Sequence, residues 1–508
     1  MKSIPRPLHV FFLMLGLPGL LFSEGPNLSP TPEAESTARA VAASLPEGYV
    51  RIGQIKPRGS REIGFSLLGI GGETLDRDFA DFEAWKDYLE PLGAKWVRLQ
   101  SGWAKTERVA GRYDFAWLDR VVDGCLQRGV QPWLELSYGN TIYPGGGGTG
   151  LLGGMMNSVE ALAAWDRYVQ ATVRHFRGRV QIYEVWNEAD GKGNKAEPNQ
   201  YARLYERTAD IIRKEQPGAI VLGLALAHVS KGAEGAVTDF IMYLGNQGKL
   251  QLVDGITVHG YPENPDDLYA ELGEIRAFLD TQVPGAVIWQ GETGAPSFPA
   301  VRAPFPLELN IDWTELSQAK WNLRRALGHI SRNIPYNQFA ISDVYYAQAN
   351  LKGVCPMGLL KAREDLSIER PKLAYFAYRN ACSIFADGLR GDPSNFAVET
   401  AHKTLEAIRF YEPFRGKHLV ALWDNGGVPG NGYESKPVSV HLQPMRISKP
   451  VLVDLLTGQV FSIPESSIRR DGLSLTLKDF PLWDSPRILC DLSILSIQME
   501  DRPNAVIP

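Results

Sequence analysis

Between residues 62 and 385, short apolar segments alternate with segments of helical periodicity, and this alternation constrains the fold more than any other feature of the chain. The expected strands are 62–69, 94–100, 130–138, 179–186, 219–226, 255–261, 286–292 and 338–347. The expected helices include 115–126, 158–177, 199–215, 235–247, 267–281, 314–332 and 370–385. Strands that alternate with helices indicate parallel strands joined by crossover helices, and eight such units close a (β/α)8 barrel. We therefore predict an α/β fold class with a TIM barrel over residues 61–387.

An open doubly wound sheet is the competing architecture for the same alternation. Such a sheet usually carries a glycine-rich fingerprint directly after its first strand. The sequence GGGGTG at 145–150 matches that fingerprint, but it follows the third expected strand and leads into more loop instead of a helix. We therefore interpret it as a mobile loop over the barrel mouth, and we do not expect it to bind a cofactor.

From about residue 388 the pattern changes to short alternating strands broken by Gly, Pro, Asn and Asp. This pattern is typical of an antiparallel β-sandwich, so we predict a second domain at 388–498 and a tail at 499–508. The segment 25–60 precedes the barrel. Its strand-like part, GYVRIGQI at 48–55, is expected to add a strand to the sandwich.

The composition is that of an ordinary globular protein, and it argues against nucleic acid as a partner. The 508 residues carry a net charge of −5 and contain no long run of Lys or Arg. A protein that binds DNA or RNA normally presents a basic patch. The four cysteines (Cys125, Cys355, Cys382 and Cys490) lack the paired spacing of a zinc site or a disulfide framework, so we treat them as structural. The sequence leaves the oligomeric state open.

The first 24 residues have the features of a signal peptide. Positively charged residues precede a mostly apolar run from His9 to Phe22, and a cleavage site is expected near residues 23–25. The run is short for a membrane span. We therefore expect a secreted or periplasmic protein whose mature form is not bound to a membrane. An uncleaved N-terminal anchor is the alternative.

Polar and acidic residues stand at the ends of the expected strands. In a (β/α)8 barrel these ends face one mouth, which is where the active sites of this fold lie. The strand-end residues are Arg98, Glu135, Asn187, Glu188, His259, Tyr261, Glu292 and Asp343. Hydrolysis of a glycosidic bond needs two carboxyl groups in different environments, one protonated and one ionised. Glu188 and Glu292, on the fourth and seventh strands, are therefore candidates for this pair, whereas Glu135 and Asp343 are interpreted as structural or at the edge of the substrate.

Two of these strand-end motifs resemble a known clan of enzymes. YEVWNEA at 183–189 resembles the W-N-E signature of strand four in clan A of the retaining glycoside hydrolases, and VIWQGETG at 287–294 resembles the nucleophile segment of strand seven. PWLELSYGN at 132–140, together with the C-terminal sandwich, is most similar to family 39, the β-xylosidase and α-L-iduronidase group. The resemblance extends over about residues 60–495. It implies a retaining O-glycoside hydrolase that acts on a plant or microbial oligo- or polysaccharide and needs no metal or organic cofactor.

The resemblance also implies roles for individual residues. Glu188 would be the general acid/base and Glu292 the nucleophile. Asn187 would hydrogen-bond the 2-hydroxyl of the sugar. Arg98 and Tyr261 would stand beside Glu292 and keep it ionised. Further substrate-binding side chains would be His259, Tyr138 and Tyr345. Trp103 and Trp289 are added because they fall near strand ends, where a ring can stack on a sugar, and core packing is the alternative for each.

The chain departs from the family pattern at two positions. Family members usually carry an aromatic residue, often Trp, in strand eight, whereas this chain has ISDVYYAQ, in which Tyr345 or Tyr346 would take that place. The Pro that usually follows W-N-E is Ala189 here. Neither change affects the two carboxylates, but both leave the identity of the sugar open, as well as exo or endo action.

Other interpretations compete with the glycosidase hypothesis. The chain could be a carbohydrate-binding protein on a glycosidase scaffold, although a binding protein has no need to keep both Glu188 and Glu292. A metallohydrolase on the same barrel would need clustered ligands, and the 8 His residues form neither an H-x-H nor an H-E-x-x-H pattern. At the level of single residues, Arg98 could be a structural ion-pair partner of Glu184 or Glu135.

Overall fold

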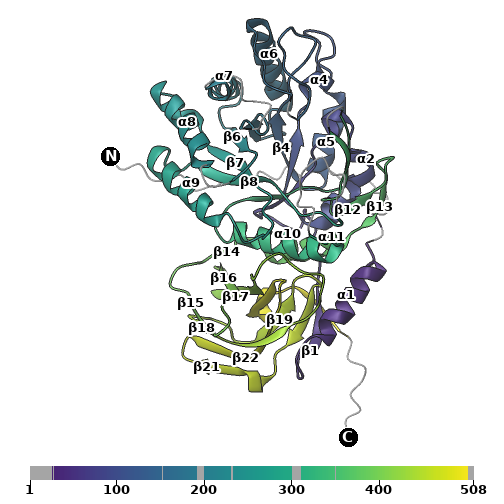
Figure 1. The fold of residues 1–508 in the computed structure, drawn as a ribbon, viewed down its shortest axis with the longest axis vertical. Helices are drawn as coiled ribbons and strands as arrows, with labels where there is room; N and C mark the ends of the chain where they lie inside the picture. The colour runs from purple at the N-terminus through teal and green to yellow at the C-terminus, as the bar shows by residue number, and fades with distance from the viewer. Residues whose placement is uncertain are drawn as a thin grey trace.

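The computed structural model describes residue 26 and residues 28–500, except 152, 191–198, 230–232, 300–310 and 349–350. The expected signal peptide at 1–24 and most of the tail at 499–508 lie outside the described residues. Figure 1 shows two domains stacked one above the other, a barrel ringed by helices and a domain of strands. Helices α10 (Glu315–Ile330) and α11 (Leu373–Ile384) lie at the junction between them.

The upper domain is a closed barrel of parallel strands, which confirms the predicted fold. Its strands are β2 (Leu68–Gly71), β3 (Trp96–Gln100), β4 (Gln131–Leu136), β5 (Ile182–Val185), β6 (Ile220–Leu226), β7 (Gly255–His259), β8 (Val287–Thr293) and β9 (Tyr336–Gln338). Besides α10 and α11, the helices of this domain are α2 (Phe82–Trp85), α3 (Leu89–Leu92), α4 (Trp103–Thr106), α5 (Ala116–Gln127), α6 (Val159–Phe176), α7 (Gln200–Glu215), α8 (Ala233–Asn246) and α9 (Tyr269–Gln282). Short 3-10 turns are η1 (Leu75–Arg77), η2 (Lys86–Tyr88) and η4 (Leu250–Leu252). The sheet closes because β9 pairs with β2, with Tyr336 opposite Leu68.

Helix α6 illustrates why these segments form helices. Ser158 caps its N-terminus by accepting a hydrogen bond from the backbone N–H of Ala161 at 3.1 Å. Its buried residues Ala164, Trp165 and Tyr168 recur at intervals of three or four, so they form one apolar face toward the barrel. The opposite face remains polar, which is the arrangement expected of a helix on the outside of a barrel.

The first and last barrel strands differ from the prediction. The first was expected at 62–69, but β2 ends two residues later, at Gly71. The last was expected at 338–347, but β9 is only Tyr336–Gln338. The alternating residues that follow form an antiparallel hairpin of β10 (Val344–Gln348) and β11 (Leu351–Cys355), because hairpin pairing satisfies their backbone as well as a barrel position would. A second hairpin, β12 (Leu360–Ala362) with β13 (Ile368–Pro371), follows.

The lower domain consists of two antiparallel sheets, which confirms the predicted β-sandwich class. The larger sheet contains, in spatial order, β14 (Arg390–Gly391), β16 (Leu405–Glu412), β17 (Lys417–Asp424), β23 (Arg487–Asp491), β19 (Pro450–Asp454), β20 (Gln459–Ser462), β1 (Val50–Ile55) and β24 (Ile497–Met499). The smaller sheet contains β15 (Ala397–Glu399), β18 (Lys436–Gln443), β22 (Ser474–Leu482) and β21 (Ile468–Asp471). Short 3-10 turns in this domain are η5 (Glu465–Ser467) and η6 (Leu492–Ile494). Buried side chains such as Leu422, Val440 and Leu452 form the core between the sheets.

The N-terminal segment belongs to this lower domain. Strand β1 pairs with β20 on one side and with β24 on the other, so it lies within the larger sheet. A helix that the sequence analysis missed, α1 (Pro32–Ala43), precedes it. Its start signals were present in the sequence, since Thr31 caps the helix and Pro32 occupies its first turn.

The glycine-rich loop at 145–150 is held by backbone hydrogen bonds. The N–H of Gly139 donates to the carbonyl of Gly148 at 2.7 Å, and the N–H of Asn140 donates to that of Gly146 at 2.9 Å. A Cβ at position 146 would lie only 1.9 Å from the Asn140 carbonyl oxygen. The glycine is therefore required by the close approach of two backbone segments.

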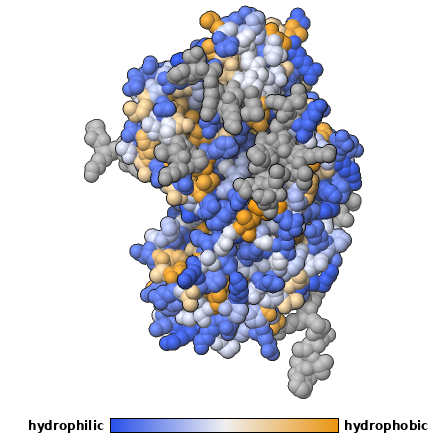
Figure 2. All heavy atoms as spheres, viewed as in Figure 1, coloured by the Kyte–Doolittle hydropathy of each residue, from blue (hydrophilic) through white to orange (hydrophobic). Residues whose placement is uncertain are grey.

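The surface in the view of Figure 2 is largely hydrophilic on both domains, with hydrophobic residues in small separate groups. Among the described residues, no helix combines the length and the apolar character that a membrane crossing requires.

Helix α10 connects the two domains. Nearly all of its residues are buried, because it packs against the barrel on one side and against the sandwich on the other. The fully buried Lys320 donates from Nζ to the carbonyls of Gly430 (3.0 Å) and Gly432 (2.7 Å) and to Asp484 Oδ1 (2.7 Å), all in the sandwich. One charged group thus satisfies three acceptors across the domain boundary.

We predict that Lys320→Met lowers the free energy of unfolding by about 2 kcal/mol, because Oδ1 of Asp484 and two carbonyl oxygens lose the donor they share. Lys361→Met is the matched control, since Lys361 pairs with Glu369 at 3.0 Å while its side chain is 41% exposed. Its loss should change stability by less than about 0.5 kcal/mol. Calorimetric unfolding of both variants measures the difference, and equal effects would contradict the assignment.

Candidate active site

The chain turns sharply at the end of β5 and thereby presents Asn187 and Glu188 to the barrel mouth. Trp186 and Glu188 adopt left-handed backbone conformations, with φ of 68° and 50°. Such conformations are uncommon for residues other than glycine and cost of the order of 1–3 kcal/mol each. The Trp186 side chain, 1% exposed, is packed against Trp165 and Tyr138, and this packing holds the turn in place.

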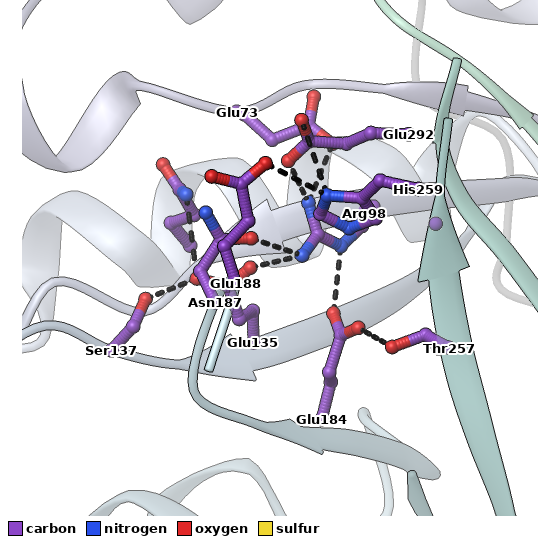
Figure 3. Close-up of polar contacts among 12 residues, drawn as sticks. Glu73, Arg98, Glu135, Ser137, Glu184, Asn187, Glu188, Thr257, His259 and Glu292 are labelled. Carbon is purple, nitrogen blue, oxygen red and sulfur yellow. Dashed lines mark hydrogen bonds and ion pairs between the residues drawn. The ribbon is translucent and has the colours of Figure 1, made fainter. Parts of the chain in front are cut away.

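Glu188 and Glu292 face the same space at the barrel mouth (Figure 3). Their side chains are 17% and 10% exposed, and His259 lies between them. Nδ1 of His259 is 3.2 Å from Glu188 Oε1 and 3.7 Å from Glu292 Oε2. One oxygen of each carboxyl group and one nitrogen of His259 lie within 4.8 Å of one another. The two strand-end carboxylates therefore share one pocket.

Arg98 lies at the centre of the site and is fully buried. Its Nε donates to Glu184 (2.7 Å), its Nη1 to Glu292 (2.5 Å) and Glu73 (3.3 Å), and its Nη2 to Asn187 (2.9 Å) and Glu135. Arg98 was interpreted either as a structural ion-pair partner of Glu184 or Glu135, or as a residue of the site beside Glu292. The structure shows both contacts, with Glu135 and Glu184 within the barrel and with Glu292 at the mouth.

Side chains fill the inside of the barrel in layers, from its base up to the mouth. The lowest contains Trp133 and Trp289, whose rings pack edge to face at 5.2 Å. Arg98 lies above them, with its guanidinium carbon 5.7 Å from the centre of the Trp133 ring. Glu188 and Glu292 form the top layer. Layered filling of this kind is usual in (β/α)8 barrels, and here it seats the charged groups on an apolar base.

Asn187 is oriented by hydrogen bonds on both sides of its amide. Its Oδ1 accepts from Arg98, and its Nδ2 donates to the Tyr138 hydroxyl at 2.9 Å. Tyr138 also accepts a hydrogen bond from Gln100 Nε2 at 3.2 Å. Tyr138 was predicted to contact the substrate. In the structure its hydroxyl orients the Asn187 side chain at the mouth.

The environment of Glu292 favours its ionised form. Burial alone would raise the pKa of Glu292, but the charges of His259 and Arg98 and the hydrogen bonds from Arg98 and Tyr261 lower it below its ordinary value. Tyr261 donates to Glu292 Oε2 at 3.1 Å. For His259 burial acts in the opposite direction and lowers the pKa. The charge of Glu292 and the hydrogen bond to Glu188 outweigh it, so the pKa of His259 is raised above its ordinary value. An ionised Glu292 is what a nucleophile requires.

Two other carboxyl groups around Arg98 are held toward the neutral form. Burial raises the pKa of Glu73 to about 8 and that of Glu135 to about 7, although Arg98 opposes both shifts. One guanidinium cannot balance four carboxylates, so part of the cluster remains protonated near neutral pH. Glu292 differs from Glu73 and Glu135 in that its pKa is lowered.

Trp103 and Trp289, both expected to contact the substrate, are buried side chains. Trp103 is fully buried between Tyr143 and Tyr168, and its Nε1 donates to Glu107. Trp289 is 3% exposed and packs against Trp133 below Arg98. Trp289 is therefore a core residue beneath Arg98, whereas Trp103, although buried, belongs to the lining of a cavity beside the mouth.

Of the two tyrosines in strand eight of the sequence, the structure turns Tyr346 toward the site instead of Tyr345. Tyr345 donates to the carbonyl of Ala362 at 3.2 Å, away from the mouth. Tyr346 is buried, packs on Phe79 at 5.7 Å and belongs to the cluster that Tyr261 joins. The prediction of Tyr345 is therefore corrected by one position, because neighbouring residues of β10 face opposite sides. Asp343 is structural, as expected, since it pairs with the buried Lys372 at 2.6 Å.

The sequence analysis missed several members of the site. They are Glu73, Gln100, Ser137 and Thr257, of which the last two donate to Glu135 and Glu184 respectively. Glu73 lies outside the predicted strand ends because the pattern places the end of the first strand at residue 69, whereas β2 ends at Gly71. The acidic residue following the glycines at 71 and 72 was the signal that could have revealed it.

Glu188, His259 and Glu292 offer donor atoms close enough to hold a cation. Arg98 and Tyr261, however, already bind the two oxygens of Glu292. A neighbouring cavity of about 360 Å³ is lined by Arg77, Lys105 and Tyr138 among others, and it offers space for a larger ligand beside the mouth.

Part of the barrel matches known glycoside hydrolases in sequence. The sequence model of glycosyl hydrolases family 39 matches residues 96–269, from the first residue of β3 to the first residue of α9. A β-xylosidase from Geobacillus stearothermophilus is 24% identical over 195 residues, which is 33% of this chain and 38% of that protein. The match thus spans well under half of that relative. The family resemblance inferred from the strand-end motifs is confirmed, and the matched segment contains Glu188 but ends before Glu292.

Solved structures of glycosidases share the fold. A family 39 glycoside hydrolase from Bacteroides cellulosilyticus WH2 has a TM-score of 0.60 at 18% identity, covering 86% of this chain and 82% of that chain. A monomeric β-xylosidase from Caulobacter crescentus CB15 has a TM-score of 0.54 at 17% identity, covering 86% of this chain and 98% of that chain. At such low identities the likeness shows the fold alone.

We predict that Arg98→Met destabilises the fold by roughly 3–5 kcal/mol near neutral pH, because it removes the cation that binds the buried carboxyl groups of Glu73, Glu135, Glu184 and Glu292. Without Arg98 the folded pKa of Glu292 is no longer held down, and the pKa values of Glu73 and Glu135, already raised, rise further. The deficit should therefore grow as pH rises from about 5 to 8 and shrink on acidification, when the groups become protonated.

Arg174→Met is the control for this substitution. Arg174 also pairs with a carboxylate, Glu215 at 2.7 Å, but its side chain is 57% exposed. Its removal should cost less than about 1 kcal/mol. Denaturant titrations of both variants at pH 5 and pH 8 test the difference, and a deficit of Arg98→Met that does not depend on pH would contradict it.

Proposed function

We propose that this chain, which resembles family 39 glycoside hydrolases over much of its barrel, is a secreted O-glycoside hydrolase that works with retention of configuration. The observation that carries the proposal is the shared pocket of Glu188 and Glu292, in which an oxygen of one lies within 4.8 Å of an oxygen of the other. Retaining enzymes hold their carboxyl groups about 5–5.5 Å apart, whereas inverting enzymes leave roughly 6.5–9.5 Å for a water molecule. The spacing here favours direct attack by a carboxylate.

In this mechanism Glu292 is the nucleophile. Arg98 and Tyr261 each bind one of its oxygens, so the carboxylate is both ionised and fixed in orientation. It attacks the anomeric carbon and forms a glycosyl ester while the glycosidic oxygen departs. Asn187, held between Arg98 and Tyr138, is placed to bind the 2-hydroxyl of the sugar.

Glu188 is the general acid and then the general base. Its protonated form gives a proton to the departing oxygen, and its ionised form then takes a proton from the water that hydrolyses the ester. Its side chain is more exposed than that of Glu292, which suits a group that must meet water in the second step. His259 contacts Glu188 through Nδ1 and keeps it beside Glu292.

The substrate we propose is a plant or microbial oligo- or polysaccharide. Matched relatives are described as β-xylosidases, so xylosides are the first substrates to test. Secretion is proposed from the N-terminal sequence alone. A binding protein on the same scaffold is the alternative, and it would bind sugar without cleaving it.

The first experiment measures hydrolysis of a panel of nitrophenyl glycosides. We expect Glu292→Ala to lower kcat/KM by at least about 10³-fold, because the nucleophile is lost. Glu188→Ala should lower it by about 10²–10⁴-fold for a poor leaving group, but far less for dinitrophenolate, which needs no proton. Glu160→Ala, an exposed carboxylate at the start of α6, is the control and should keep full activity.

The stereochemistry of the product separates the mechanisms. Proton NMR of the first product should show the same anomeric configuration as the substrate. An inverted product would refute the double displacement while leaving a glycosidase. A sugar bound and recovered intact, across the whole panel, would favour the binding protein.

Tyr261→Phe is predicted to move the acid limb of kcat/KM to higher pH by roughly 0.5–1 unit, because it removes a hydrogen bond that stabilises ionised Glu292. The sign follows from the pKa, which Tyr261 helps to hold low and which must rise when the donor is lost. Tyr375→Phe is the matched control, since its hydroxyl donates to the Tyr88 carbonyl at 2.9 Å, outside the site. A profile unchanged in both variants would contradict the role of Tyr261.

A further inference from the structure

Glu73 is a buried carboxyl group beside Glu292 that the proposed mechanism does not use. It lies two residues after the end of β2 and is 3% exposed. Figure 3 shows its side chain adjacent to that of Glu292, above Arg98. Its Oε2 folds back over Gly71, where a Cβ would lie only 2.2 Å away, so the glycine makes room for this position.

Glu73 and Glu292 share a single nitrogen of Arg98. Nη1 is 2.5 Å from Glu292 Oε1 and 3.3 Å from Glu73 Oε1. A guanidinium carries five N–H donors, and here all five directions are taken. Because the two N–H groups of Nη1 are fixed in one plane on the same nitrogen, a movement of the guanidinium toward Glu73 lengthens its contact with Glu292.

The remaining donors in the site are distributed unequally. Glu292 has Tyr261, Glu184 has Thr257, and Glu135 has Ser137 and Gln100. Glu73 has only the long contact to Arg98 among the side chains described, and its Oε2 is buried with no hydrogen-bond partner among the residues of the structure that are described. An ionised Glu73 would therefore carry charge on a bare buried oxygen, which is strongly unfavourable. Of the four carboxyl groups, Glu73 is therefore the one whose ionised form receives the least support from hydrogen-bond donors.

We propose that Glu73 is a positioning residue for Glu292: as a neutral acid it leaves Arg98 Nη1 to the nucleophile, and when it ionises it draws that nitrogen away. This inference rests on the proposed role of Glu292. Loss of the 2.5 Å contact would release one of the two groups that orient the attacking carboxylate. Misalignment of a reacting group by about 1 Å can lower a rate by about 10²-fold.

The charged groups around Glu73 support this protonation state. Arg98 on β3 and Glu292 on β8 face it directly. Through Arg98 it is coupled to Glu135 on β4 and Glu184 on β5. Burial raises the pKa of Glu73, Arg98 lowers it and the charge of Glu292 adds to the rise, so that the pKa is about 8. Glu73 is therefore neutral at pH 7 and ionises above pH 8.

The test uses covalent inactivation by a 2-deoxy-2-fluoroglycoside with a dinitrophenolate leaving group. This probe reports attack by Glu292 without needing a proton from Glu188. In the wild type the inactivation rate should fall by up to about tenfold between pH 7 and pH 9, as a group of pKa about 8 ionises. In Glu73→Gln, which remains neutral and keeps the shape of the acid, the rate should stay level over this range.

Glu135→Gln is the comparison that isolates the shared nitrogen. Glu135 is equally buried and also binds Arg98, but through Nη2. This variant should keep the wild-type fall in rate between pH 7 and pH 9. The proposal is overturned if Glu73→Gln still shows that fall, or if Glu135→Gln abolishes it to the same extent. Should Glu73→Gln fold poorly, Glu73→Met is the second neutral variant, with the same expected profile.

A readout independent of activity separates this inference from the proposed function. Difference infrared spectroscopy detects the carbonyl stretch of protonated carboxyl groups. A band at pH 7 that disappears near pH 8, and that is absent from Glu73→Gln, would support a neutral Glu73 even if no fluoroglycoside labels Glu292. Absence of such a difference between wild type and Glu73→Gln would overturn the inference, whereas failure to label Glu292 with any sugar would overturn the proposed function instead.

Discussion

The site depends on one buried guanidinium. Arg98 lies within the barrel, donates to Glu184, Glu135, Glu73 and Glu292, and also orients Asn187. A lone buried cation would be prohibitively unfavourable, and so would the carboxylates without it. Each therefore requires the other. The closed barrel supplies the geometry, because consecutive parallel strands bring their ends to one place from segments far apart in the chain.

The barrel also explains how chemically similar carboxyl groups acquire different properties. Glu292 receives donors on both oxygens and has a lowered pKa, whereas Glu73 and Glu135 are held toward the neutral form by burial. Glu188 stands apart from Arg98, on a turn with left-handed backbone, and contacts His259 instead. The carboxyl groups differ in pKa because each receives a different number and arrangement of hydrogen-bond donors.

The accuracy of the sequence-based interpretation varied with the range of the interactions involved. Helices such as 158–177 and 199–215 were located within one or two residues, because their amphipathic period and caps are local. The last barrel strand was placed wrongly, because an alternating segment suits a hairpin as well as a barrel position. Among aromatic residues, Trp289 was assigned to the mouth although it packs beneath Arg98, since proximity to a catalytic residue in sequence does not reveal depth in a barrel.

The sequence by itself determined the succession of strands and helices, the sandwich that follows, and the positions of Glu188 and Glu292 at strand ends, because these depend on periodicity and on short motifs. Only the tertiary structure decided which side chains share Arg98, that Tyr346 and not Tyr345 turns toward the site, and that Glu73 lies beside Glu292. The physical reason is that successive side chains on a strand point to opposite faces of the sheet. A shift of one residue in register therefore moves every inward-pointing side chain to the outer face. Register is set by the closure of the whole sheet, which no local pattern contains.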